Sequence, residues 1–187
     1  MRRPILPLFL LLLTASFAHA QVKWSPSDQQ QLNTFKLTLE RVNQVDNAME
    51  AFARRLETDP AYKAKIKRLD DIESGKVEPT PEEAAELERQ EQEEAEDGSL
   101  AGMERKIERE PKLAAMIKSA GMTPREFVLT EMALFQAMFA HTMKKQGYLK
   151  ELPKEVPAEH VAFVAAHEKE IEALTKKWQA ISKQMEK

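Results

Sequence analysis

Four ionisable side chains occupy positions where the spacing of apolar residues predicts a buried helix face. They are Asp46, Glu131, His160 and His167. A carboxylate or imidazole on such a face is costly to bury unless it pairs with another group. The same side chains are ligands for Zn²⁺ and for non-haem metals. These four residues are therefore the candidates for chemistry in this chain.

Two of the four lie on an apolar stripe in the last predicted helix, which runs from about residue 157 nearly to the end. The stripe alternates spacings of four and three, as in a helix face packed against other helices. Histidine takes its first and third positions. Its members are His160, Val164, His167, Ile171, Leu174, Trp178, Ile181 and Met185.

Asp46 lies on a similar stripe in a first helix, predicted from Ser25 or Ser27 to about Leu56. It is the one charged member of that stripe. The stripe consists of Phe35, Leu39, Val42, Asp46, Met49, Ala53 and Leu56.

Glu131 lies in the most apolar element, a helix predicted over 124–146. Ala133, Ala137 and Ala140 cluster on one side of this helix, where another helix could approach closely. A buried carboxylate without a partner costs several kcal/mol or stays protonated. We therefore expect Glu131 to have a partner or water beside it. The apolar sector around it comprises Phe127, Val128, Met132, Leu134, Phe135, Met138, Phe139 and Met143.

The favoured interpretation of these residues is structural: one buried His–carboxylate pair, joined by a hydrogen bond, fixes how the helices align. His141 lies at the edge of the apolar sector and is expected to be a surface or boundary residue. A second interpretation is a Zn²⁺ or non-haem metal site formed by the same residues. The candidate metal ligands are Glu131, His160, His167 and Asp46.

The metal interpretation lacks the Glu-x-x-His pattern of carboxylate-bridged dimetal bundles, because Val164 lies three residues before His167. A third interpretation is non-covalent haem or another apolar ligand, held by a histidine with Met49 or Met138. The favoured interpretation requires no cofactor, and no residue is assigned a catalytic role.

The elements that position these residues are helices almost throughout. We predict an all-α fold, an irregular helical bundle of about six to seven helices with long amphipathic helices at both ends. Thr80-Pro81-Glu82-Glu83 and Thr123-Pro124-Arg125-Glu126 are capping boxes that begin helices. Helices are expected to break or end at Asp59-Pro60, Gly75, Pro111, Gly121 and Gly147.

Residues 21–187 are treated as one helical domain that includes an acidic segment at 78–98. Residues 78–97 hold ten acids and one base, and Leu87 is their only large apolar residue. Such a segment has little to bury, so it is either a solvated helix or a partly disordered insert. A docking arm for a basic partner is the alternative.

One stretch of the chain echoes another. ETDPAYKAKIK at 57–67 aligns with EREPKLAAMIK at 108–118 with five of eleven positions identical. The favoured explanation is that both stretches end one helix and begin the next in the same way, and a duplication is the alternative. A solenoid would need three or more units.

The first twenty residues, MRRPILPLFLLLLTASFAHA, are typical of a secretory signal peptide. Arg2 and Arg3 precede a short apolar run, and Ala18-His19-Ala20 predicts cleavage after Ala20. The run is shorter than the ~20 residues that a membrane-spanning helix needs. We expect a bacterial periplasmic or extracellular protein, whose mature chain is soluble and has no membrane span.

Composition excludes several classes of function. The 187 residues contain no cysteine, which rules out disulfides, thiolate metal sites and a cysteine nucleophile. The net charge is −3, and losing the two arginines of the signal makes the mature chain more acidic, so no nucleic-acid partner is expected. Gly-x-Ser-x-Gly, phosphate-binding glycine loops and His-Glu-x-x-His are absent.

Three stretches carry a resemblance: PKLAAMIKSAGMTPREFVLT at 111–130, ALFQA at 133–137 and VPAEHVAFVAAH at 156–167. The chain resembles uncharacterised exported all-helical proteins of soil-type bacteria over its last ~80 residues. The resemblance implies export and helicity, and it implies no activity.

The sequence favours a non-enzymatic binding or structural protein of the cell envelope, with a protein partner and an oligomeric state that the sequence leaves open. One alternative is a metal- or haem-binding bundle that uses Glu131 and His167. Another is a periplasmic chaperone-like protein, because methionines and long amphipathic helices suit adaptable apolar contacts. The Leu-Thr-x-x-Gln repeat of small helical stress chaperones is absent, since Ala133 follows Leu129-Thr130 at the glutamine position.

Overall fold

The computed structural model describes residues 24–96 and 99–185, and within these ranges the chain forms helices and no strands. The predicted all-α class is confirmed. The predicted signal peptide, residues 1–20, lies outside the described residues. No helix in the described ranges is long and apolar enough to cross a membrane.

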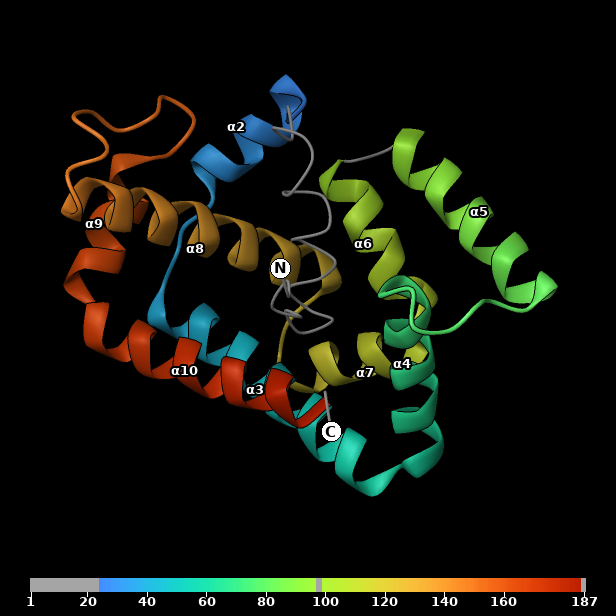
Figure 1. Cartoon of the computed structure of the whole chain (residues 1–187). Coiled ribbons are helices and arrows are strands. Elements are labelled where there is room, and N and C mark those ends of the chain that lie inside the picture. The colour runs from blue at the N-terminus through green and yellow to red at the C-terminus, as the bar shows by residue number, and fades with distance from the viewer. Residues whose placement is uncertain (1–23, 97–98, 186–187) are drawn as a thin grey trace.

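The described ranges contain nine helices, so the predicted number of six to seven was wrong. Both extra helices come from the two terminal helices, each of which is divided in the structure (Figure 1). The nine are α2 (Pro26–Thr34), α3 (Leu39–Thr58), α4 (Pro60–Glu73), α5 (Pro81–Glu96), α6 (Leu100–Arg109), α7 (Pro111–Ser119), α8 (Pro124–Lys145), α9 (Ala158–Ala166) and α10 (Glu168–Met185).

The first division falls between α2 and α3. Phe35 and Leu37 are buried, whereas Lys36 between them is exposed. Residues two positions apart point about 200° apart on a helix but to the same side of an extended chain, so the extended form buries both. The Thr38 hydroxyl then caps α3 by accepting a hydrogen bond from the Arg41 N–H at 3.3 Å.

The second division falls at His167, whose backbone leaves helical geometry (φ −118°, ψ 27°). Hydrogen bonds continue on both sides of it. The His167 N–H donates to the Phe163 carbonyl at 3.1 Å, and the His167 carbonyl accepts from the Ile171 N–H at 3.0 Å. The chain changes direction here, and α10 then packs along α3 (Figure 1).

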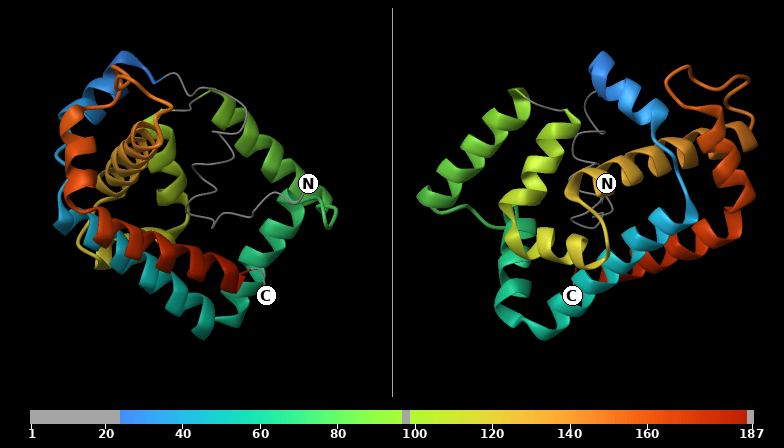
Figure 2. Two further views of the ribbon diagram at one scale, coloured as in Figure 1. Left: turned by 60° about the vertical axis from the view of Figure 1, so that its left-hand side comes forward. Right: turned by 180° about the vertical axis from the view of Figure 1, so that it is seen from behind.

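Helix α8, the most apolar of the predicted helices, is the central element. It contacts α2, α3, α6, α7 and α9, and Figure 2 shows it nearly end-on with other helices around it. Its alanine side is almost completely buried at Ala133, Ala137 and Ala140, which confirms the expected close approach. Its large apolar sector is buried at Phe127, Val128, Met132 and Leu134 but exposed at Phe139.

The buried side chains form two clusters. One joins α3, α4, α6, α7 and the first half of α8. The other joins the extended segment at 35–37 to α3, α8, α9 and α10, and Leu129 and Trp178 pack against both clusters. The second cluster consists of Phe35, Leu37, Val42, Ala133, Leu134, Ala137, Val164 and Ile171.

Both predicted capping boxes form. The Thr123 N–H donates to Glu126 Oε2 at 3.0 Å, and the Glu126 N–H donates to Thr123 Oγ1 at 3.1 Å. The same reciprocal bonds join Thr80 and Glu83, at 2.7 and 3.2 Å. The box formed by Thr80 and Glu83 begins α5. Most of the acidic segment is therefore a helix, which lies at the edge of the molecule (Figure 2).

The expected helix stops at Gly75, Gly121 and Gly147 have φ of 70°, 84° and 79°, in the left-handed region that favours glycine. At Gly121 a side chain would also be crowded. A Cβ there would meet Gln44 Nε2 at 3.1 Å.

Candidate functional site

Asp46 pairs with the last helix rather than with a histidine. Lys177 Nζ donates to Asp46 Oδ2 at 2.6 Å, and Trp178 Nε1 donates to Asp46 Oδ1 at 2.9 Å. Lys177 also bonds Glu50 one turn further along α3. We call Asp46, Glu50, Lys177 and Trp178 the α3–α10 polar cluster.

Charges within this cluster stabilise one another. The hydrogen bond from Lys177 holds the pKa of Glu50 below its ordinary value. Burial alone would lower the pKa of Lys177, but the hydrogen bonds to Asp46 and Glu50 outweigh burial and raise it. The cluster therefore fixes how α10 aligns on α3.

His160 serves a structural role of the same kind. Its ring is buried, and Nε2 lies 2.6 Å from the carbonyl oxygen of Phe35. A carbonyl can only accept, so Nε2 carries the hydrogen in this contact. The bond ties α9 to the extended segment between α2 and α3.

His167 lies at the junction of α9 and α10. Its ring is half-buried and packs against the Phe163 ring, with 4.8 Å between ring centroids. The structure gives His160 and His167 no carboxylate partner among the described residues. The histidine that does lie near a carboxylate is His141, whose Nε2 is 3.5 Å from Glu168 Oε1.

Glu131 differs from the other three because no polar partner is found for it in the described part of the chain. Its side chain is half-buried among apolar residues of α8, and burial raises its pKa to about 8. Near neutral pH a large share of this side chain is therefore protonated, and no bond to its neighbours offsets its burial.

The structure does not assemble the four predicted residues into one centre. In residues 24–96 and 99–185, no three His, Asp or Glu side chains are grouped so that they could hold a metal ion. Asp46, His160 and His167 each have a separate contact in the helix packing, whereas Glu131 has no polar partner among the residues that the structure describes.

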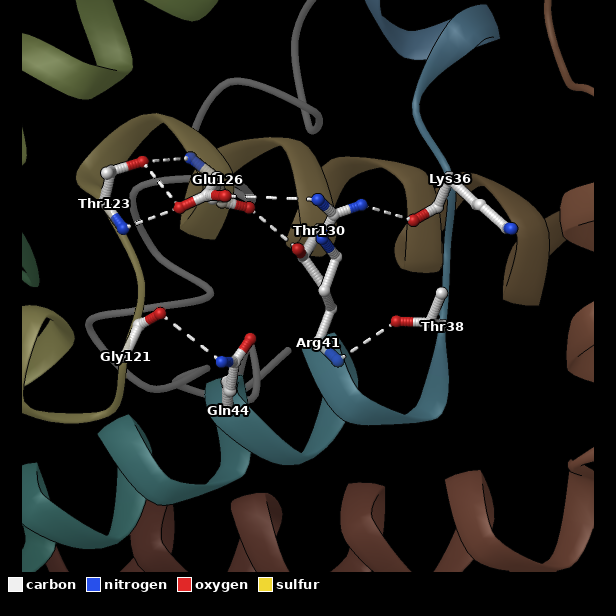
Figure 3. Close-up of polar contacts among 8 residues, drawn as sticks. All are labelled: Lys36, Thr38, Arg41, Gln44, Gly121, Thr123, Glu126 and Thr130. Atoms are coloured by element: carbon white, nitrogen blue, oxygen red, sulfur yellow. Dashed lines mark hydrogen bonds and ion pairs between the residues drawn. The ribbon is translucent and has the colours of Figure 1, made fainter.

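A second set of polar contacts joins the start of α3 to the start of α8 (Figure 3). Arg41 Nη1 donates to the Lys36 carbonyl at 2.7 Å, and the guanidinium lies 4.6 Å from the centroid of the Phe35 ring. Arg41 Nη2 lies 3.9 Å from Glu126 Oε1. One arginine thus links the extended segment, α3 and the capping box of α8.

Two further hydrogen bonds stabilise the start of α8, one from Gln44 of α3 and one from Thr130 within α8. Gln44 Nε2 donates to the Gly121 carbonyl at 3.3 Å, and the Thr130 hydroxyl donates to the Glu126 carbonyl at 2.7 Å (Figure 3). The hydrogen bond from the Thr123 N–H keeps the pKa of Glu126 low. These contacts set the direction in which α8 begins.

Arg125 makes a third link, between α2, α6 and α8. Its Nη1 lies 3.6 Å from Glu104 Oε2, and its Nη2 lies 4.0 Å from Asp28 Oδ1 and bonds Gln31. Asp28 is buried and also accepts a hydrogen bond from the Ser25 hydroxyl at 3.0 Å. Sequence reasoning missed this cluster, because Arg125 reads only as part of a capping box.

The two echoing stretches pack reciprocally. Asp59, at the start of α4, pairs with Lys112 of α7 at 3.1 Å, and Glu110, at the start of α7, pairs with Lys65 of α4 at 2.6 Å. The Tyr62 N–H and Lys112 lower the pKa of Asp59 to about 2. Each helix–Pro–helix corner therefore supplies the acid that binds the other corner's lysine.

The carboxyl end of α8 carries a different kind of surface. Phe139 is 55% exposed and Tyr148 is 75% exposed, and these are the large apolar side chains that stand out in solvent among the described residues. Met143, one turn after Phe139, is half-buried. We call Phe139, Met143 and Tyr148 the apolar end of α8.

Backbone geometry explains how Tyr148 is presented. The Tyr148 N–H donates to the Met143 carbonyl at 2.9 Å and the Gly147 N–H donates to the Lys144 carbonyl at 3.1 Å. This is the Schellman arrangement, in which the residue after the glycine often packs back on the last helical turn. Tyr148 instead projects into solvent.

In comparisons with known proteins, no family model, no curated protein and no solved structure matches the chain.

Proposed function

We propose that the chain is an exported, non-enzymatic binding protein of the cell envelope, built as an irregular helical bundle, whose binding face is the apolar end of α8. The observation that carries the proposal is that the two exposed large apolar side chains, Phe139 and Tyr148, lie in the last turns of α8 and just after it. Exposed apolar groups gathered in one place are typical of binding surfaces.

The polar residues support a binding rather than a catalytic role. Asp46, His160 and Arg125 each bond to groups on another helix or segment, so their acid, base and donor groups serve packing. Among the described residues, no side-chain hydrogen bond or ion pair joins Phe139, Met143 or Tyr148 to another helix, although Lys145 nearby pairs with Glu168.

Binding of the apolar dye bis-ANS tests this face. We expect the folded protein to increase the dye's fluorescence, and the Phe139→Ser/Tyr148→Ser variant to lose most of the increase. The control is Ala115→Ser, at an exposed position of α7 at the other end of the molecule. This variant should bind dye as the wild type does. Equal dye binding by the double variant would contradict the proposal.

Export is tested by expressing the whole chain in a bacterium and fractionating the cells. The predicted cleavage after Ala20 gives a mature protein that begins at Gln21 in the periplasmic or secreted fraction. Recovery of the uncleaved chain from the cytoplasm alone would contradict export.

The same exposed side chains favour a second candidate, a chaperone-like role toward unfolding proteins. Phe139, Met143 and Tyr148 could hold the apolar segments of such a client. In that case the protein should suppress aggregation of an unfolding client, and Phe139→Ser/Tyr148→Ser should not. No suppression at several-fold molar excess would remove this candidate.

A further inference from the structure

The apolar end of α8 adjoins a basic stretch of an acidic chain. Residues 144–154 contain four lysines and one glutamate, whereas the whole chain has a net charge of −3. The lysines are Lys144, Lys145, Lys150 and Lys154, and all four are exposed. The rest of the chain is therefore more acidic than its total suggests.

Three of these lysines have no acidic partner among the described residues. Lys145 pairs with Glu168, but no ion pair joins Lys144, Lys150 or Lys154 to another described side chain. By contrast, Lys65, Lys112 and Lys177 each pair with an acid on another helix or corner. The free lysines at this end leave local positive charge uncompensated.

We propose that the apolar end of α8, with Lys144, Lys150 and Lys154, binds an anionic lipid surface. This inference rests on the proposed function and names its partner. Tyrosine and phenylalanine insert at the boundary between headgroups and acyl chains, and lysine stems lie along apolar surface while their ammonium groups reach lipid phosphates. The chain presents both kinds of group together at one end.

Two features favour a lipid surface over an acidic protein. Tyr148 projects with three-quarters of its side chain in solvent, a shape that inserts into a soft layer, whereas a protein partner would need a pocket built to receive it. The four exposed lysines of residues 144–154 attract anionic lipid next to the exposed aromatic side chains, whereas the net acidic chain as a whole would be repelled.

Sedimentation with lipid vesicles tests the proposal. The mature protein should pellet with vesicles of equimolar phosphatidylglycerol and phosphatidylcholine, less so as salt increases, and not with pure phosphatidylcholine. Each lysine near an anionic surface contributes about fivefold, so Lys144→Gln/Lys150→Gln/Lys154→Gln should weaken binding about a hundredfold.

The matched control makes the same charge change elsewhere. Lys63→Gln/Lys67→Gln/Lys118→Gln replaces three exposed lysines of α4 and α7, at the other end of the molecule, and should bind vesicles as the wild type does. Phe139→Ser/Tyr148→Ser should lower vesicle binding at least tenfold. All these positions are exposed, and circular dichroism should show unchanged helicity.

Several results would overturn the lipid proposal: no vesicle binding, equal binding to neutral vesicles, or equal losses in the two triple-lysine variants. Self-association that the Lys144, Lys150 and Lys154 substitutions abolish in the absence of lipid would assign the surface to a second copy instead. If bis-ANS binding depends on Phe139 and Tyr148 while vesicles do not bind, the lipid inference fails and the binding face stands. If the dye binding does not depend on them, the proposed function itself fails.

Discussion

Two sides of α8 contrast sharply. The alanine side, Ala133, Ala137 and Ala140, is buried along its whole length, whereas the large apolar sector is buried at Phe127 and Met132 but more than half exposed at Phe139. Small side chains let helix backbones approach closely. The apolar character of a side chain therefore does not by itself tell how far its position is covered.

The largest expected effect comes from enlarging the alanine side. Ala137→Leu adds three carbons where the side chain is fully buried, and should lower the free energy of unfolding by about 2–3 kcal/mol. Urea denaturation measures the change. Ala115→Leu, exposed on α7, is the control and should change it by less than about 0.5 kcal/mol. Equal effects of the two substitutions would mean that the alanine side is not tightly packed.

A second test extends the contrast to the two acids on predicted buried faces, Asp46 and Glu131. Lys177→Met removes the cation that pairs with Asp46 and should lower the free energy of unfolding by about 2 kcal/mol. This is less than the loss of a fully buried ion pair would cost, because Lys177 is partly exposed. Lys176→Met, one position earlier and exposed, should cost almost nothing. Thermal unfolding measures the stability of the two variants. Similar melting temperatures for both would show that the α3–α10 polar cluster does not stabilise the fold.

The unpaired acid should behave in the opposite way. The folded pKa of Glu131, about 8, exceeds the ordinary value of 4.5, so the folded state holds an extra proton between these values. The stability it contributes is present below pH 4.5 and lost as the pH rises toward 8. Glu131→Gln should thus be more stable than the wild type at pH 9, with a much smaller difference near pH 5. A difference independent of pH would show that Glu131 does not ionise in this range.

The smallest stability effect is expected at the exposed end of the same helix. Phe139→Ser should change the free energy of unfolding by no more than about 0.5 kcal/mol, because the side chain is more than half exposed. The effect of Phe139→Ser should instead be a lower fluorescence increase on bis-ANS binding. A cost near 2 kcal/mol would place Phe139 in the core and remove it from the binding face.

Local signals in the sequence predicted the local structure well. The capping boxes at Thr80 and Thr123, the proline starts of α4 and α7 and the glycine stops all lie where expected, because each depends on a few adjacent residues. The division at 35–38 was not predicted, since Phe35 also fits the helical spacing of the first stripe. Only the burial of Leu37 two positions later makes an extended chain the better solution.

Periodicity located the ionisable residues but could not name their partners. It placed Asp46 on an inner face, but the pairing with Lys177 depends on how α10 lies along α3. A lysine that borders an apolar stripe and follows one turn after Leu174 is a weak signal for such a pair. The exposure of Phe139 could not be predicted from the sequence either, because the spacing of apolar residues in one helix does not show which neighbouring helices cover it.

The pairing of Asp46 with Lys177 has a consequence for the order of folding. The two residues are 131 positions apart, whereas Arg68 and Glu83, which join α4 to α5, are 15 apart. Corners such as α3–α4 and α6–α7 can form within short loops, but the chain must search a far larger set of arrangements before α10 meets α3. Docking of α10 should therefore be a late and slow event in refolding, and the time it takes should limit how soon the α3–α10 polar cluster is complete.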